Sequence, residues 1–126
     1  MQNGGTVLVV DVEDATTEAA ATLTSLGYKI ATASDVVSAM AKVGADASIL
    51  AMLVEITLQG ATQLADHVAR CHPAVRVIFI TSYPEMLLLD REAPGGRLLL
   101  RKPLDADKVR AGLTADRAAP PTRNVR

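Results

Sequence analysis

The chain has few aromatic residues and a single cysteine. Its 126 residues include one phenylalanine, two tyrosines and no tryptophan, although 49% of them are hydrophobic. A chain of this length can bury one core and form one domain, and that core must be built from Val, Leu, Ile and Ala. Cys71 has no second cysteine with which to form an internal disulfide, and this cysteine usage fits a reducing compartment.

An excess of charge and long apolar runs are also missing. The 13 basic and 14 acidic residues give a formal net charge of −1, which does not support the basic face that nucleic-acid binding needs. No apolar run approaches the roughly 20 residues of a membrane-spanning helix, and residues 1–5 lack the charged and apolar parts of a signal peptide. We therefore expect a soluble cytoplasmic domain that has neither nucleic acid nor a membrane as its partner.

The sequence does contain a regular alternation of apolar runs and helical segments. The apolar runs predict strands at residues 7–10, 28–33, 47–54, 75–81 and 98–101. Helices are predicted at residues 15–26, 36–43, 61–71 and 84–90, with a last one from 106 to about 114. The expected N-caps are Asp14, Asp35 (or Ser34) and Asp105, and the expected helix stops are Gly27 and Gly44.

Strands that alternate with helices of about ten residues predict βαβ units and a parallel sheet with right-handed crossovers. Five such units favour a flavodoxin-like (βα)5 three-layer α/β sandwich with strand order 2-1-3-4-5. We expect one domain over residues 1–115 and a disordered tail over residues 116–126. Sites in open α/β sheets lie beyond the carboxyl ends of the strands. This rule places Asp11, the segment 54–57, Thr81 and Lys102 around one crevice.

Three segments carry a resemblance to a known family. Residues 6–11 end in Asp11, residues 77–83 contain Thr81, and residues 98–104 contain the pair Lys102-Pro103. Together they resemble the receiver (CheY-like) domain of two-component response regulators. The resemblance implies a signalling module rather than an enzyme, with a histidine kinase or another signalling protein as its partner. It also implies a cis peptide bond before Pro103.

The resemblance assigns roles to single residues. Family members bind Mg²⁺ through clustered carboxylates, and Asp11 matches the first of two acidic residues at the end of strand one. Its neighbour is Val12 where the family usually has Asp or Glu. Because a valine cannot ligate Mg²⁺, we expect weak metal binding. Thr81 matches the threonine that hydrogen-bonds a phosphoryl oxygen, and Lys102 matches the lysine that pairs with the acyl phosphate.

The phosphate-accepting aspartate of the family is missing, because residues 48–56 contain no aspartate. Three alignments replace it with different residues. A shorter loop puts Glu55 at the acceptor position, the usual loop length puts Leu53 there, and counting forward from Asp46 selects Ala51. We favour Glu55 because it preserves the family's sequence pattern and carries a carboxylate. Leu53 would leave an apolar pocket instead.

These observations favour a receiver-like module that acts by protein–protein interaction, with phosphotransfer lost or weak. One alternative is a working phosphoacceptor in a phosphorelay that uses an atypical acceptor residue. Another is a small flavodoxin-like ligand-binding subunit, although no Gly-rich phosphate loop follows strand one. Residues 86–89 and 98–100 are more apolar than one short helix and one strand require. They suggest a homodimer through the fourth helix and fifth strand.

Overall fold

The computed structural model describes residues 5–82 and 97–114, without the side chains of residues 13–16. Five strands and four helices lie in this part of the chain. The strands are β1 (Thr6–Val10), β2 (Lys29–Ala33), β3 (Ile49–Glu55), β4 (Arg76–Thr81) and β5 (Leu99–Arg101). The helices are α1 (Glu13–Ser25), α2 (Val36–Ala45), α3 (Ala61–Cys71) and α5 (Ala106–Thr114).

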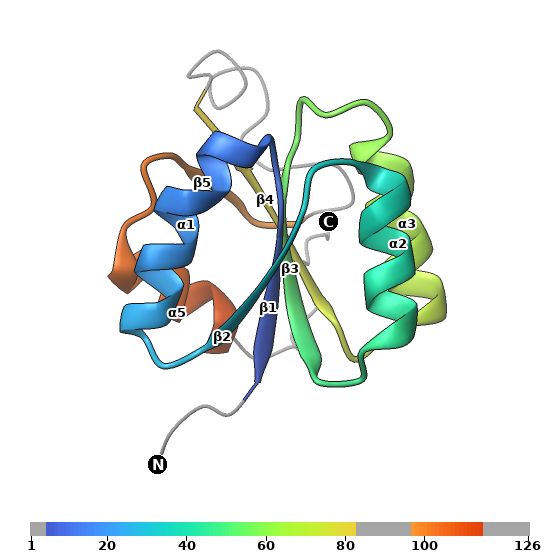
Figure 1. Cartoon of the computed structure of the whole chain (residues 1–126), viewed down its shortest axis with the longest axis horizontal. Coiled ribbons are helices and arrows are strands. Elements are labelled where there is room, and N and C mark those ends of the chain that lie inside the picture. Colours follow the sequence, from blue (N-terminus) through green and yellow to red (C-terminus); the bar gives the residue numbers. More distant parts are fainter. Residues whose placement is uncertain (1–4, 83–96, 115–126) are drawn as a thin grey trace, which may run out of the picture.

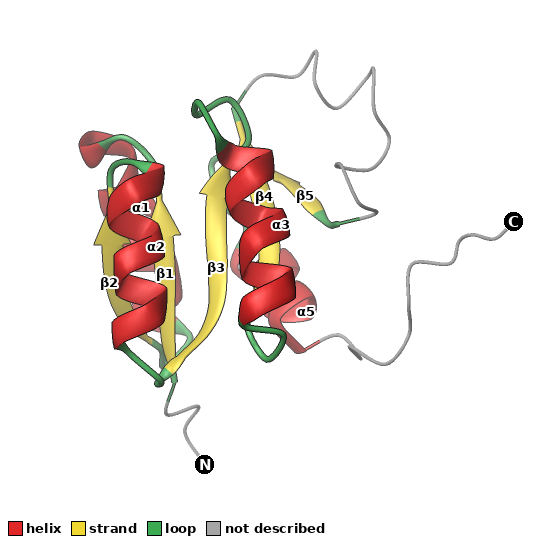
Figure 2. Cartoon of the chain, turned by 90° about the vertical axis from the view of Figure 1, so that its right-hand side faces the viewer, coloured by secondary structure: helices red, strands yellow, loops and turns green. Residues whose placement is uncertain are grey.

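The strands form one parallel sheet in the order β2-β1-β3-β4-β5. Helices α1 and α5 cover one face of this sheet, and α2 and α3 cover the other (Figure 1). The predicted flavodoxin-like order is therefore confirmed. The arrows of β1 and β3 point to the same edge of the sheet (Figure 2), so their carboxyl ends meet there. Val10 of β1 pairs with Val54 of β3, which makes Asp11 and Glu55 the next residues on these neighbouring strands.

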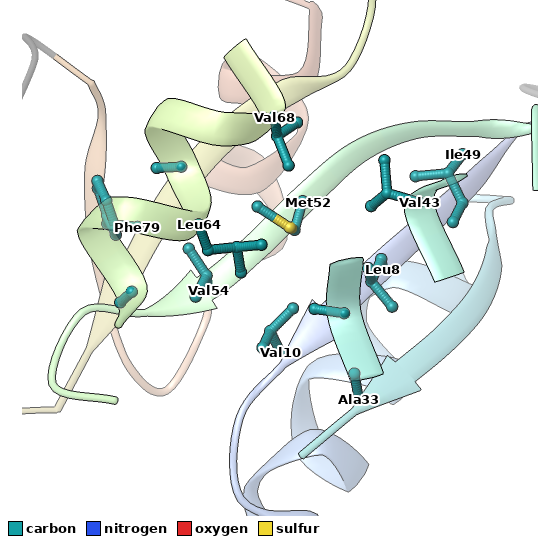
Figure 3. Close-up of a cluster of buried hydrophobic side chains, with 13 residues drawn as sticks. Leu8, Val10, Ala33, Val43, Ile49, Met52, Val54, Leu64, Val68 and Phe79 are labelled. Atoms are coloured by element: carbon teal, nitrogen blue, oxygen red, sulfur yellow. The ribbon is translucent and has the colours of Figure 1, made fainter. Parts of the chain in front are cut away.

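The central strands are apolar along their length because helices cover both of their faces. All five residues of β1 are buried, as are six of the seven residues of β3. Side chains alternate between the two faces of a strand. Leu8 and Met52 therefore join the core under α2 and α3 together with Phe79 (Figure 3). The opposite core, under α1 and α5, is built mainly from the residues Val7, Val9, Leu23, Ala51, Leu53, Ile78 and Ile80.

Most predicted helix ends are confirmed by local hydrogen bonds. The Asp35 carboxylate accepts from the Ser38 N–H at 2.8 Å, and the Asp105 carboxylate accepts from the Asp107 N–H at 2.8 Å. Gly27 follows the end of α1 with a φ of 95°, a left-handed conformation that favours glycine. The predicted bounds of α3 match the observed ones, and those of the five strands differ by at most two residues at either end.

Two predicted helix ends are wrong. Helix α1 begins at Glu13 with Val12 at the N-cap, so Asp14 lies inside the helix rather than capping it. The Asp11 carboxylate accepts from the Val12 N–H at 2.7 Å. Only Asp11 and Val12 separate the end of β1 from the start of α1. Helix α2 does not stop at Gly44. It continues to Ala45, and Asp46 is its C-cap. The side chain of Asp46 accepts two hydrogen bonds from Ser48.

Some predictions lie outside the described residues. They are the helix at 84–90, the tail at 116–126, and most of the proposed dimer surface of the fourth helix and fifth strand. Within the described part of the chain, no helix is both long enough and apolar enough to cross a membrane.

Candidate functional site

Four polar residues meet at the carboxyl edge of the sheet. Asp11 follows β1, Glu55 ends β3, Thr81 ends β4, and Lys102 follows β5. Asp11 is 2% exposed, Glu55 4% and Thr81 0%. Buried polar groups of this kind need partners, because an unpaired charge away from water is costly. The sequence predicted that these four strand ends would converge, and the structure brings them together.

Lys102 links the two buried carboxylates. Its Nζ lies 2.6 Å from Asp11 Oδ2 and 2.8 Å from Glu55 Oε1, and its side chain is 15% exposed. The Lys102 N–H donates to the Thr81 carbonyl at 2.8 Å, which ties this residue to the end of β4. The Lys102–Pro103 peptide bond is cis, as the resemblance implied.

The remaining carboxylate oxygens are also occupied. Asp11 Oδ1 accepts from the Val12 N–H at 2.7 Å. Glu55 Oε2 accepts from the Thr57 N–H at 3.1 Å and from Thr57 Oγ1 at 2.9 Å. Thus each of the four oxygens of Asp11 and Glu55 has at least one donor.

Thr57 is a site residue that sequence reasoning missed. It lies in the loop between β3 and α3, two residues after Glu55, and it is exposed. Acidic side chains often bond to the backbone a short distance along the chain, and a hydroxyl two residues later offers a second donor. The sequence Glu55-Ile56-Thr57 was the available signal.

Opposing effects act on the ammonium group of Lys102. Burial disfavours its charged form and by itself would lower its pKa. The hydrogen bonds and negative charges of Asp11 and Glu55 outweigh burial, and they raise the pKa of Lys102 above its ordinary value of 10.5. Lys102 therefore stays protonated at neutral pH. The cluster joins two carboxylates to one ammonium group, so its formal charges do not cancel.

The other two candidates for the acceptor position lie elsewhere. Leu53 and Ala51 are fully buried, and both contribute to the core under α1 and α5. Glu55 differs from both, because its carboxylate contacts Lys102 at the sheet edge.

The described side chains fit Mg²⁺ poorly. This cation prefers six oxygen ligands in octahedral geometry, several of them usually water. Both oxygens of Asp11 already accept hydrogen bonds, one of them from the cationic Lys102. Val12 is exposed and has no oxygen in its side chain. Among the side chains that the structure describes (residues 5–12, 17–82 and 97–114), no group of three or more His, Cys, Asp or Glu could hold a metal ion.

Solved structures with this fold are numerous, although no protein-family model and no curated protein matches the sequence. The receiver domain of the response regulator PhyR from Erythrobacter litoralis is 25% identical to the chain, with a TM-score of 0.70. That match covers 99% of this chain and 98% of the other. A response regulator receiver protein from Sinorhizobium medicae is 18% identical, with a TM-score of 0.70 and coverages of 88% and 92%.

A third similar structure contains bound groups. It is a response regulator from Burkholderia pseudomallei with a phosphorylated aspartic acid, a calcium ion and citrate, and it is 20% identical to the chain. Its TM-score is 0.67, and the match covers 88% of this chain and 67% of the other. The structures from Erythrobacter litoralis and Sinorhizobium medicae are response regulator receiver proteins, and the chain has their fold.

Proposed function

We propose that the protein is a receiver-like signalling module of a two-component or phosphorelay system. It acts mainly by binding partner proteins, a histidine kinase or another signalling protein, and not as an enzyme. Its capacity for phosphotransfer is lost or weak. One observation carries this proposal: the Lys102 ammonium group is already paired with two buried carboxylates, at 2.6 Å and 2.8 Å.

The proposal gives Glu55 the acceptor position. Two observations support this assignment: Glu55 follows Val54, the partner of Val10 in the sheet, and its carboxylate contacts Lys102. A glutamate here places a fixed negative charge beside the lysine that would pair with an acyl phosphate. The mimicry is partial, because a phosphoryl group carries up to about two negative charges against one for Glu55.

Phosphotransfer to Glu55 is weak for reasons of geometry. The glutamate side chain is one methylene longer than that of aspartate, and a misplacement of about 1 Å can cost roughly a hundredfold in rate. Both of its oxygens accept hydrogen bonds in the resting site. Val12 adds no ligand for the cation that would neutralise the transferred group, so Mg²⁺ binds weakly through Asp11.

Intact-mass measurement after incubation with acetyl phosphate and Mg²⁺ tests the proposal. We expect no phosphoryl adduct on the wild-type protein. The double variant Val12→Asp/Glu55→Asp restores a second metal carboxylate and the shorter arm, and we expect it to gain one adduct, on the substituted side chain at position 55.

Two outcomes would contradict this account. A phosphorylated wild-type chain would favour the alternative of a working phosphoacceptor with an atypical acceptor residue, which peptide mapping would identify. An adduct on the single variant Leu53→Asp, but not on the double variant, would show that Leu53 holds the acceptor position. Circular dichroism of each variant controls for loss of the fold.

A further inference from the structure

We infer that Thr57 is a positioning residue that holds the Glu55 carboxylate in place against Lys102. The two donors of Thr57, its N–H and its hydroxyl, both bind Glu55 Oε2. The other oxygen, Oε1, is thereby turned toward the Lys102 ammonium group at 2.8 Å.

Two donors on one oxygen restrict the carboxylate more than either donor could alone. A glutamate side chain has several rotatable bonds, and ordering it costs conformational entropy. The backbone N–H of Thr57 holds Glu55 Oε2 at 3.1 Å, and the Thr57 hydroxyl donates to the same oxygen from a second direction at 2.9 Å. Together they oppose rotation of Glu55 away from the site, where its charge would become solvated.

The loop holds Thr57 itself in place through its neighbours. The Ile56 N–H donates to the Ile80 carbonyl at 3.0 Å, and the Leu58 N–H donates to the Glu55 carbonyl at 3.1 Å. The backbone at Thr57 is therefore fixed on both sides without its side chain. Removing the hydroxyl should release one bond to Glu55 while leaving the fold of the loop intact.

Asp11 offers an internal reference for this effect. It contacts the same ammonium group at 2.6 Å, and its second oxygen is held by Val12 rather than by Thr57. Loss of the Thr57 hydroxyl should weaken the Glu55 side of the cluster and spare the Asp11 side. The consequence for signalling rests on the proposed function, because a loosened Glu55 would be a poorer mimic of a phosphoryl group.

Crystal structures of Thr57 variants test the positioning role, because they measure the separation of Glu55 and Lys102 directly. We expect the distance between Glu55 Oε1 and Lys102 Nζ to exceed hydrogen-bonding range in Thr57→Val and Thr57→Ala and to stay near 2.8 Å in Thr57→Ser. Thr114→Val is the matched control, because it removes an exposed hydroxyl that donates to the Arg110 carbonyl in α5.

The Asp11 side of the cluster separates positioning from a general structural effect. The distance between Asp11 Oδ2 and Lys102 Nζ should stay near 2.6 Å in every Thr57 variant. An unchanged distance between Glu55 and Lys102 in Thr57→Val would overturn the inference, and so would an equal lengthening of the contact between Asp11 and Lys102. Neither outcome depends on phosphorylation or on a partner. The positioning role can therefore fail this test while the proposed function stands, and the proposed function can fail while the positioning role stands.

Discussion

Two regions depart in opposite ways from the usual pattern of buried apolar and exposed charged residues. They are the carboxyl edge of the sheet and the outer surface of α2. At the sheet edge, Asp11 and Glu55 are charged residues that are almost fully buried. On α2, Val37 is 79% exposed and Met40 is 37% exposed, while Ala39 and Val43 face the core. A buried charge must keep its partners, whereas a single exposed apolar side chain needs none. Substitutions should therefore matter far more at the first region than at the second.

The largest expected effect comes from removing the cation that joins the two carboxylates. Lys102→Met leaves Asp11 and Glu55 close together without a counter-charge. We expect a loss of about 3–5 kcal/mol in the free energy of unfolding, as for other buried ion pairs that lose one partner. Urea denaturation measures this loss.

Arg110→Met is the matched control for that variant. Arg110 forms an exposed ion pair with Asp107 at 3.5 Å, within one helix. Such pairs contribute about 0–1 kcal/mol. If both variants lost the same free energy of unfolding, the buried ion pairs of Lys102 would contribute no more to stability than the exposed pair of Arg110.

A smaller loss in the free energy of unfolding should follow when the pH is raised. The folded state raises the pKa of Lys102 above 10.5. Its contribution to stability is therefore fully present below pH 10.5 and is lost as the pH rises through the higher pKa of the folded state. A neutral amine can still hydrogen-bond to the carboxylates, so the loss should be less than in Lys102→Met.

Urea midpoints measured from neutral pH to above the ordinary lysine pKa check this expectation. The alkaline loss of stability should be smaller in Lys102→Met, because other lysines contribute equally to both proteins. If both proteins lost stability in parallel, Lys102 would not be the group responsible.

The smallest change in the free energy of unfolding is expected on α2, and it is a gain rather than a loss. Gly44 lies inside this helix with nothing within 4 Å of the position that a Cβ would take. Gly44→Ala should raise the free energy of unfolding by about 0.5–1 kcal/mol, because glycine is a poor helix former. Gly112→Ala in α5 is the contrasting variant, since its Cβ would lie 2.8 Å from a side-chain atom of Leu98 and 3.2 Å from one of Ile78. Thermal denaturation should show a gain for Gly44→Ala and a smaller gain or a loss for Gly112→Ala.

The sequence was enough to predict the sheet and the edge where the site lies. Apolar runs revealed the central strands, because buried parallel strands are apolar on both faces. The resemblance to receiver domains identified Asp11, Thr81 and Lys102 as site residues, and their positions at strand ends predicted that they would meet. The start of α1 was missed because Val12 has none of the side-chain oxygens by which N-caps are usually identified.

The choice among Ala51, Leu53 and Glu55 could not be made from periodicity. Side chains alternate along a strand, so these three residues lie on the same side of β3. Their environments differ only because the helices cover Ala51 and Leu53, and β3 ends at Glu55. Which of them corresponds to the family's acceptor remains a prediction for the phosphorylation experiment. Thr57 was missed because the signal for it, a hydroxyl two residues after Glu55, does not by itself separate a threonine that binds a carboxylate from one that is solvated.

The contact between Lys102 and Asp11 joins residues that are 91 positions apart in the sequence. Closing so long a loop is entropically costly, and contacts of this range are expected to form after local helices and neighbouring strands. An interaction absent from the folding transition state slows the opening of the native molecule and leaves its rate of formation nearly unchanged. The stability lost in Lys102→Met should then appear mainly as faster unfolding, so the charged cluster would govern the lifetime of the folded molecule.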